Sequence, residues 1–388
     1  MRRISIFGAT GSIGENTLDL IARRRDCRVV ALSGGRNIAR LAELARAHSA
    51  ELAVTAYPDC HAALKAALAG TGVEVAAGPE ALIEAALRPA DWIMSAIVGA
   101  AGLAPGFAAL TQGTTLALAN KESLVAAGPV LMAEAARHGA TILPVDSEHS
   151  AVFQALVGED IAAVERVIIT ASGGPFRDWP AARLARATLA EAAAHPNWSM
   201  GQRISVDSAS LFNKALELIE TREYFGIDPA RIEVLVHPQS IVHALVGFSD
   251  GGLMAHLGPP DMRHAIGFAL NWPHRGPVPV ARLDLAALGQ LTFEPPDPVR
   301  FPALRLAREV METGGLAGAA FNAAKEVALD HFIDGRLGFG AMAVVVETAL
   351  SRLSSDLGLT LAATNLDTVL RMDHLARVRT EEVITAMA

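Results

Sequence analysis

Cysteine is nearly absent from this 388-residue sequence, which contains only Cys27 and Cys60. Neither residue belongs to a Cys-x-x-Cys motif or to a cluster of cysteine and histidine, so we expect no disulfide framework and no thiolate zinc site. A chain with this cysteine usage is expected in the reducing cytoplasm. Aromatic residues are also scarce, because alanine, leucine and valine supply most of the apolar content. That composition is typical of helices packed on a buried parallel sheet.

A basic surface and a long apolar run are missing as well. The formal net charge is -8, whereas non-specific nucleic-acid binding requires basic surface, so we expect no nucleic-acid partner. Residues 92–120 carry no charge, but glycine, proline and polar residues interrupt them. A membrane-spanning helix needs about 20 mostly apolar residues in a row, and the apolar stretch at 4–7 is too short for a signal peptide. We therefore expect no membrane association.

Short apolar runs alternate with alanine- and leucine-rich helical segments through the first part of the chain. Residues 2–7 predict a strand, a helix begins at Ser12, and residues 28–32 predict a second strand. Further elements are predicted at residues 38–48, 51–55, 60–69, 80–87, 92–98, 104–110 and 115–119. This alternation predicts an α/β fold whose N-terminal domain, residues 1–145, is a Rossmann-type doubly wound parallel sheet.

The rest of the chain has a different pattern. Residues 146–285 mix predicted strands at 164–170, 232–237, 241–248 and 252–257 with a helix near 208–220, which predicts an α+β domain. Its irregular turns favour a catalytic domain, because loops often carry function. Prolines are dense toward residue 302, so residues 286–302 are predicted to be a linker. Residues 303–388 then show helical spacing in several segments, which predicts a small C-terminal helical domain.

A glycine-rich loop follows the first predicted strand and opens a helix. Gly8, Gly11 and Gly14 are spaced so that backbone N–H groups and the helix N-terminus can approach a pyrophosphate. An NAD site usually places an acidic residue about 20 residues further on. The sequence there has no acid and instead contains Arg36, which could pair with a 2′-phosphate, so NADP(H) is the predicted cofactor.

Carboxylates in two segments suggest a cation site. Asp146 and Glu148 follow a predicted strand, so their side chains are expected to project to the same side at the carboxyl edge of the sheet. On a later helix Glu217 lies one turn from Asn213 and Lys214. Carboxylates without clustered thiols or imidazoles favour Mg²⁺ or Mn²⁺. Spacing alone leaves an alternative open, in which Glu217 pairs with Lys214 on a solvated helix face and Asp146 caps a turn.

Three further segments could serve an anionic substrate. Ser172 begins a Ser-Gly-Gly-Pro turn after a strand and could expose its hydroxyl to an anion, with Ser208, Asn213 and Lys214 completing the site; the alternative is an ordinary turn. Lys121 beside Glu122 is either an exposed pair or a contact to substrate and cofactor. Residues 195–201, with an aromatic residue and a glycine that can act as a hinge, are typical of a lid.

These motifs occur together in one known family. The sequence resembles 1-deoxy-D-xylulose 5-phosphate reductoisomerases over essentially its whole length. The matching segments are 8–14 (GATGSIG), 119–125 (ANKESLV), 144–149 (PVDSEH), 172–177 (SGGPFR), 195–201 (HPNWSMG), 206–209 (VDSA), 213–214 (NK) with Glu217, and 237–240 (HPQS). The resemblance implies a cytoplasmic homodimer that rearranges 1-deoxy-D-xylulose 5-phosphate and reduces the product with NADPH to 2-C-methyl-D-erythritol 4-phosphate, an isoprenoid precursor.

The resemblance also implies roles for individual residues. The NADPH contacts would be Thr10, Gly11, Ser12, Ile13, Gly35, Arg36, Asn37, Asn120, Glu122 and Gly201. The metal ligands would be Asp146, Glu148 and Glu217. The substrate's carbon chain would contact Lys121, Ser147 and Glu148, and its phosphate would contact Ser172, His195, Ser208, Asn213 and Lys214. The lid would carry Trp198 and Met200.

Two departures from the family pattern stand out. Arg36 occupies a position where many members have lysine, and Ser210-Leu211-Phe212 replaces a more usual Thr-Met-Met run, a change that bears on packing.

Two rival functions are considered. One rival is another NADP-dependent dehydrogenase, which needs no metal and acts on a small phosphorylated substrate. The other is a non-catalytic NADP-sensing module. A requirement for a divalent metal would exclude the first rival, and turnover of the sugar phosphate would exclude the second.

Overall fold

A computed structural model describes residues 1–198 and 200–387, so Ser199 and Ala388 lie outside the described residues. The chain divides into two compact units, each made of several segments. The first unit consists of Met1–Ser123, Leu131–Ser150 and Asp261–Val280. The second unit consists of Leu124–Val130, Ala151–Pro260 and Ala281–Ala388. The functional boundaries expected after residues 145, 285 and 302 stay predictions.

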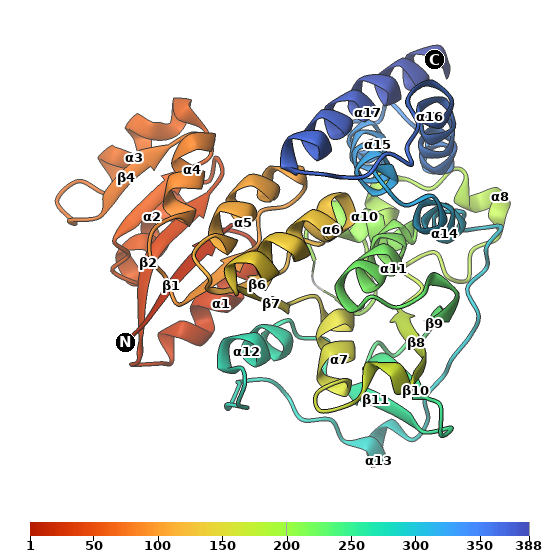
Figure 1. Cartoon of the computed structure of the whole chain (residues 1–388), viewed down its shortest axis with the longest axis horizontal. Helices are drawn as coiled ribbons and strands as arrows, with labels where there is room; N and C mark the ends of the chain where they lie inside the picture. The colour runs from red at the N-terminus through yellow and green to blue at the C-terminus, as the bar shows by residue number, and fades with distance from the viewer. Residues whose placement is uncertain (199, 388) are drawn as a thin grey trace. The chain divides into compact units, whose positions relative to one another are not determined.

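The first unit is built on a seven-stranded parallel sheet (Figure 1). Its strand order is β4-β3-β2-β1-β5-β6-β7. The strands are β1 Arg2–Phe7, β2 Cys27–Gly34, β3 Leu52–Thr55, β4 Glu74–Ala77, β5 Trp92–Ser95, β6 Thr115–Leu118 and β7 Thr141–Pro144. The order reverses between β1 and β5, and in such sheets ligands bind at the carboxyl ends of the strands beside this reversal. The predicted Rossmann-type sheet is confirmed.

Helices cover this sheet because their apolar faces pack on strands that are buried on both sides. They are α1 Ser12–Ala22, α2 Ile38–Ala47, α3 His61–Ala67, α4 Pro79–Ala86, α5 Leu103–Leu110, most of α6 Lys121–His138 and α12 Arg263–Asn271, with 3₁₀ turns at Pro58–Cys60 and Ala100–Gly102. Although α12 comes late in the sequence, it packs against α1, β6 and β7. The indole N–H of the fully buried Trp92 donates to the carbonyl oxygen of Ala269 at 3.1 Å.

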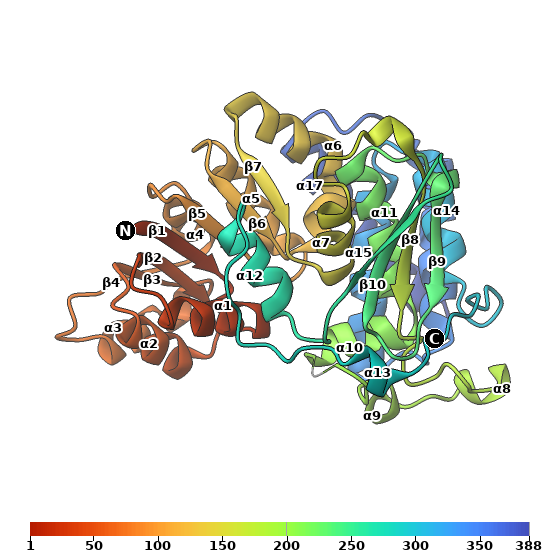
Figure 2. The same ribbon diagram turned by 90° about the horizontal axis from the view of Figure 1, so that it is seen from below.

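The second unit contains a four-stranded mixed sheet with the order β11-β10-β8-β9. Its strands are β8 Val164–Ala171, β9 Ile232–Val236, β10 Val242–Phe248 and β11 Leu253–Leu257. Figure 2 shows β10, β8 and β9 side by side. β8 pairs with β9 in parallel, whereas β10 is antiparallel to both of its neighbours. β11 is therefore an edge strand, and most of its side chains are exposed. The predicted α+β region is confirmed in this sheet and the helices that follow.

The helices of the second unit lie between β8 and β9 and after β11 in the sequence. They are α8 Ala181–Leu184, α9 Leu189–Ala192, α10 Gln202–Ala209, α11 Phe212–Phe225, α13 Leu285–Leu288, α14 Ala303–Thr313, α15 Ala317–Ile333, α16 Ala341–Leu357 and α17 Leu366–Met387, with 3₁₀ turns at Ile161–Ala163 and Pro229–Arg231. α15 packs against both α16 and α17, and α11 packs against α14. The C-terminal helical region is thus confirmed. Within the described residues, no helix has the length and apolar character needed to cross a bilayer.

Three local expectations are corrected. The single helix expected near 208–220 is two helices, because Leu211 adopts a left-handed conformation with φ of 57° and breaks the chain between α10 and α11. The strand expected to reach residue 98 ends at Ser95. Glu148 does not continue a strand from Asp146, since α7, Ser147–Ala155, begins directly after Asp146.

Candidate functional site

The loop between β1 and α1 has two positions that only glycine can occupy. Gly8 has φ of +91°, and a Cβ there would lie 2.4 Å from the carbonyl oxygen of Ala96. A Cβ at Gly14 would lie 2.4 Å from the carbonyl oxygen of Gly8. No side chain caps the N-terminus of α1 at Gly11. The N–H groups of its first turn, in residues Ser12 to Gly14, are therefore oriented for an anion such as a pyrophosphate.

The segment after β2 presents a cation at the surface. The Arg36 side chain is 60% exposed and forms an ion pair with Asp59, with 2.7 Å between Nη1 and Oδ2. Its guanidinium carbon lies 4.0 Å from the ring centroid of Tyr57. Asn37 caps α2 by accepting the Arg40 N–H at 3.2 Å. Tyr57 and Asp59 were not predicted from the sequence, and no motif signals them because they contact Arg36 across neighbouring strands of the fold.

Asn120 organises the start of α6, the helix that follows β6. Its side-chain oxygen accepts the Ser123 N–H at 2.8 Å, and its amide donates to the carbonyl oxygens of Ile97 and Gly99. The next residue, Lys121, reaches the carboxylate of Asp146, with 3.0 Å between Nζ and Oδ1. Both side chains of this pair are largely buried, so the exposed-pair alternative for Lys121 is wrong.

A buried histidine holds the other oxygen of Asp146. The Nδ1 atom of His149 lies 3.1 Å from Oδ2 of Asp146, and His149 has no exposed surface. Beside it, the Ser147 hydroxyl donates to the carboxylate of Glu148 at 2.5 Å. Glu148 lies in the first turn of α7, where the helix dipole favours a carboxylate. His149 was missed as a partner of Asp146, although its spacing of three residues on one helical turn was a usable signal.

The second unit carries a buried carboxylate on α11. Glu217 has no exposed surface, and Lys214 is only 3% exposed. Asn213 donates to one carboxylate oxygen of Glu217 at 2.6 Å, and the Lys214 ammonium lies 2.5 Å from the other. The pair expected on a solvated helix face therefore forms, but its burial contradicts the solvated reading. Burying two charges is costly, which is typical of residues retained for function.

Ser172 and His195 form a second polar pair in this unit. The Nε2 atom of His195 lies 2.9 Å from the Ser172 hydroxyl oxygen. The Nδ1 atom accepts the backbone N–H groups of Asn197 at 3.2 Å and Trp198 at 2.9 Å. These two bonds assign the neutral tautomer with its proton on Nε2, which donates to Ser172. Burial lowers the pKa of His195 to about 4, so the ring is neutral at physiological pH.

The turn that carries Ser172 packs on the end of α10. The Gly174 N–H donates to the Ser172 hydroxyl oxygen at 3.1 Å. A Cβ on Gly174, which has φ of +65°, would lie 3.0 Å from the carbonyl oxygen of Ser208. The second unit thus brings the Ser172 turn against Ser208, and Asn213 and Lys214 follow on the next helix. These are four of the five residues expected at the phosphate, and His195 is the fifth.

The segment expected to be a lid is anchored at its start. The amide of Asn197 donates to the Pro238 carbonyl oxygen at 2.6 Å and to the Ser240 hydroxyl at 2.9 Å. The Trp198 ring lies 6.2 Å from the His243 ring, centroid to centroid. Met200 is partly buried, and Ser199 lies outside the described residues. Gly201 precedes α10 with φ of -62° and open space around its Cβ position, so backbone geometry does not require glycine there.

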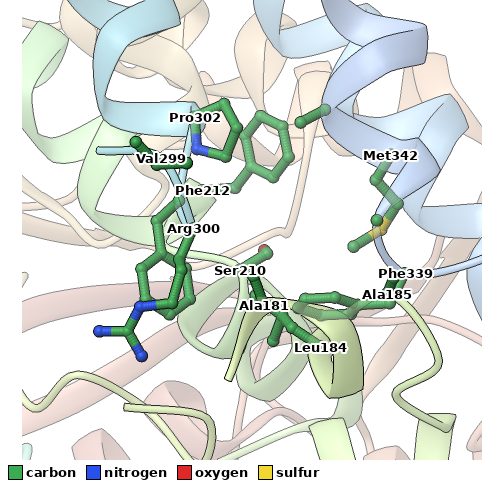
Figure 3. Close-up of a pocket in the computed structure, with 13 residues that line it drawn as sticks. Ala181, Leu184, Ala185, Ser210, Phe212, Val299, Arg300, Pro302, Phe339 and Met342 are labelled. Atoms are coloured by element: carbon green, nitrogen blue, oxygen red, sulfur yellow. The ribbon is translucent and has the colours of Figure 1, made fainter. Parts of the chain in front are cut away.

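The turn between α10 and α11 also borders an apolar cavity of about 180 Å³ (Figure 3). Ser210 and Phe212 line it together with residues of α8 and α16. The Ser210 hydroxyl donates to the carbonyl oxygen of Val206 at 2.9 Å. The Arg300 guanidinium donates to backbone carbonyl oxygens of residues 177 and 179. Because these polar groups have partners, the Ser210-Leu211-Phe212 departure bears on packing.

Comparison with known families gives matches along most of the chain. The model of "1-deoxy-D-xylulose 5-phosphate reductoisomerase" matches residues 4–128. Models of C-terminal domains of the same enzyme match residues 142–225 and 257–379.

Individual relatives carry the same description. The chain is 69% identical to 1-deoxy-D-xylulose 5-phosphate reductoisomerase of Ruegeria pomeroyi over 100% of this chain and 98% of the relative. It is 71% identical to the enzyme of Cereibacter sphaeroides over 98% of each chain. The solved structure from Zymomonas mobilis in complex with NADPH is 46% identical, covers 99% of both chains and has a TM-score of 0.91. A complex of the enzyme with NADPH, fosmidomycin and magnesium is 39% identical, covers 100% of this chain and 99% of that one, and has a TM-score of 0.94.

Proposed function

Because this chain belongs to the 1-deoxy-D-xylulose 5-phosphate reductoisomerase family, we propose that the residues expected from its sequence form that enzyme's active site. The chain is an NADPH- and divalent-metal-dependent oxidoreductase and isomerase, which converts 1-deoxy-D-xylulose 5-phosphate to 2-C-methyl-D-erythritol 4-phosphate. The observation that supports the residue assignment is the complete burial of Glu217. Its carboxylate accepts a hydrogen bond from Asn213 and pairs with the Lys214 ammonium. Neither a metal-independent dehydrogenase nor an NADP-sensing module accounts for family membership along the whole chain.

The proposed metal ligands are Asp146, Glu148 and Glu217. All three offer carboxylate oxygen, the donor that suits Mg²⁺ or Mn²⁺, and solved relatives contain magnesium. The fit is supported by the hydrogen bonds that already orient each carboxylate, including the bond between His149 and Asp146. Such outer partners fix the orientation of metal ligands. When bound, the ion supplies Lewis-acid polarisation of the substrate's carbonyl and neighbouring hydroxyl.

The cofactor is NADPH, as in the solved relative from Zymomonas mobilis. The uncapped first turn of α1 suits its pyrophosphate, and the exposed guanidinium of Arg36 suits its 2′-phosphate. The Asn120 side chain is occupied inside the fold, which leaves its backbone as the contact. The proposed contacts are Thr10, Gly11, Ser12, Ile13, Gly35, Arg36, Asn37, Asn120, Glu122 and Gly201.

The substrate phosphate binds between Ser172, His195, Ser208, Asn213 and Lys214. Neutral His195 directs its Nε2 proton at the Ser172 oxygen, so the Ser172 hydroxyl proton is available to a phosphate oxygen. The ammonium of Lys214 adds charge in a buried place, where electrostatic attraction is strong. Binding of the phosphate, which is distant from the reacting carbons, orients those carbons for the reaction.

Groups of the first unit act at the reacting carbons. Lys121, Ser147 and Glu148 face the carbon chain and its hydroxyls. The Lys121 ammonium lies beside Asp146, where it stabilises an oxygen that gains negative charge during reduction. Residues 195–201, with Trp198 and Met200, close over the substrate and exclude water.

The working form is a homodimer in the cytoplasm. β11 is an edge strand, and Leu253 and Met254 on it are 50% and 43% exposed. An edge with apolar side chains is suited to pairing with a second copy of the chain. Cys27 and Cys60 are free thiols, as expected in a reducing compartment.

A coupled assay tests the proposal. Purified protein is mixed with 1-deoxy-D-xylulose 5-phosphate and NADPH, and NADPH oxidation is followed with and without metal. We expect oxidation that stops after exhaustive chelation and returns on addition of Mn²⁺ or Mg²⁺. Oxidation that continues after chelation would support the metal-independent dehydrogenase, and no oxidation at all would support the sensing module.

A further inference from the structure

A second buried ion pair lies in the second unit, away from Glu217. Lys325 on α15 contacts Asp207 on α10, with 3.0 Å between Nζ and Oδ2. Their side chains are 3% and 9% exposed. The sequence offered no reason to single out Lys325, because it lies in an alanine-rich helix and belongs to no motif.

The position of Asp207 links this pair to the phosphate residues. Asp207 directly precedes Ser208, and its buried side chain faces α15. Ser208 is only partly buried, and its backbone lies against the turn that carries Ser172. A rotation or shift of α10 on α15 would therefore move Ser208 relative to Ser172.

A second ion pair joins the same two helices and provides a natural comparison. Arg203 on α10 pairs with Asp330 on α15, and their side chains are 38% and 49% exposed. Arg203 and Asp207 are four residues apart on α10, so they lie on the same face of that helix. The outer pair is in solvent, where such pairs contribute little. The inner pair is desolvated, so separating its charges is costly.

The inner pair also continues into the C-terminal helix. Glu326, the neighbour of Lys325, accepts hydrogen bonds from Asn322 at 3.1 Å and from Arg377 of α17 at 2.5 Å. Arg377 in turn contacts Asp373, with 2.8 Å between Nε and Oδ2. Glu326 thus links the turn of α15 that carries Lys325 to α17 through Arg377.

We propose that Lys325 and Asp207 are positioning residues, whose buried contact sets α10 so that Ser208 meets the substrate phosphate. A buried polar contact acts well in this role because it is satisfied in only one register, whereas apolar side chains slide with little loss. The inference rests on the proposed function, which places Ser208 at the phosphate. The C-terminal helices therefore contribute to substrate binding through α10, without a contact of their own to the substrate.

The test compares Lys325→Met with the double variant Lys325→Met/Asp207→Leu. The single variant leaves a buried carboxylate without its cation and will lower thermal stability. The double variant removes both charges and is expected to regain stability, since apolar replacements of buried pairs are often neutral. In both variants we expect the KM for 1-deoxy-D-xylulose 5-phosphate to rise about tenfold, the change in affinity for a single weakened charged contact. The inhibition constant of inorganic phosphate should rise in parallel, while the NADPH dissociation constant stays unchanged.

Two controls make the outcomes distinct. Arg203→Met removes the outer pair of the same helices and is expected to leave the substrate KM unchanged. Ser208→Ala tests the proposed function itself and should raise the KM. A double variant with regained stability and a normal KM would overturn the positioning role, as would an equal rise of KM in Arg203→Met. If Ser208→Ala has a normal KM, the proposed contact between Ser208 and the substrate phosphate is wrong.

Discussion

The glycine loop of the first unit and the α11 cluster of the second are suited to charged groups by opposite means. Between β1 and α1, glycines and the N–H groups of a helix N-terminus form the site, and the charged side chain nearby, Arg36, is exposed. On α11, a carboxylate and an ammonium are buried against each other. A backbone site depends on shape, whereas the buried cluster depends on the chemical identity of each side chain. Substitutions should therefore act differently in the two regions.

The largest effect is expected at Glu217. Glu217→Gln keeps the size of the side chain but removes a proposed metal ligand and the ion pair with Lys214. We expect kcat to fall by several orders of magnitude while NADPH still binds, because the substitution lies in the substrate cluster alone. Steady-state kinetics measures the fall in kcat, and fluorescence titration measures NADPH binding. Near-normal turnover under limiting metal would remove Glu217 from the ligand set.

The complementary change is Gly14→Ala in the backbone site. Its Cβ would lie 2.4 Å from the Gly8 carbonyl oxygen, so the loop must shift. We expect about 1–3 kcal/mol of destabilisation from this overpacking, and a loss of NADPH affinity. Chemical denaturation and cofactor titration measure the two effects. Gly11→Ala is the matched comparison for stability, because its Cβ would meet nothing nearer than 3.4 Å. Equal destabilisation by both variants would contradict the steric account.

Arg36 provides a smaller and salt-dependent effect. Arg36→Gln should weaken NADPH binding by about 10–100-fold, the range for a hydrogen bond to a charged group. The NADH affinity should not change, and the difference should shrink as ionic strength rises. Arg40→Gln is the control, since Arg40 forms ion pairs with Glu15 and Glu43. If both cofactors lose affinity equally, Arg36 does not read the 2′-phosphate.

The smallest effect concerns the pH dependence of stability. The pKa of His195 is about 4 in the folded chain, below the ordinary 6.5, because of burial. Between these values the unfolded state binds more protons, so folding stability falls as pH falls from about 6.5 toward 4. The contribution is modest because water reaches part of the ring and screens its charge. The free energy of unfolding is measured against pH for the unchanged protein and for His195→Gln. The excess stability of the unchanged protein should decline as pH falls through this window and stay constant outside it. A flat difference would show that burial does not shift the His195 pKa.

The two regions also differ in how far the sequence predicts them. The β1 strand, the glycine loop and the start of α1 were predicted at their observed positions, because that information is local. β4 was missed, since its Glu-Val-Ala-Ala run has little alternation and lies at the sheet edge. α6 was also missed, because Gly128 and Pro129 interrupt its helical pattern.

The polar partners of the site are the least predictable part. Local spacing predicts that Lys214 can reach Glu217, but it does not tell whether the pair is buried. The contact between Lys325 and Asp207 joins residues 118 positions apart, so it depends on the packing of α15 on α10. The same holds for Arg36 and Asp59, which meet only after β2 and β3 pair. Local patterns thus predict elements and candidate residues, and tertiary packing decides their partners.

The central claim is that Asp146, Glu148 and Glu217 hold one divalent ion, and Mn²⁺ titration tests it most directly. Binding is measured by calorimetry, or by the electron paramagnetic resonance signal of free Mn²⁺, for the unchanged protein, Asp146→Asn and Glu217→Gln in the presence of NADPH. We predict one Mn²⁺ per chain in the unchanged protein and a marked loss of affinity in both variants. Undiminished Mn²⁺ binding in either variant would contradict the shared site.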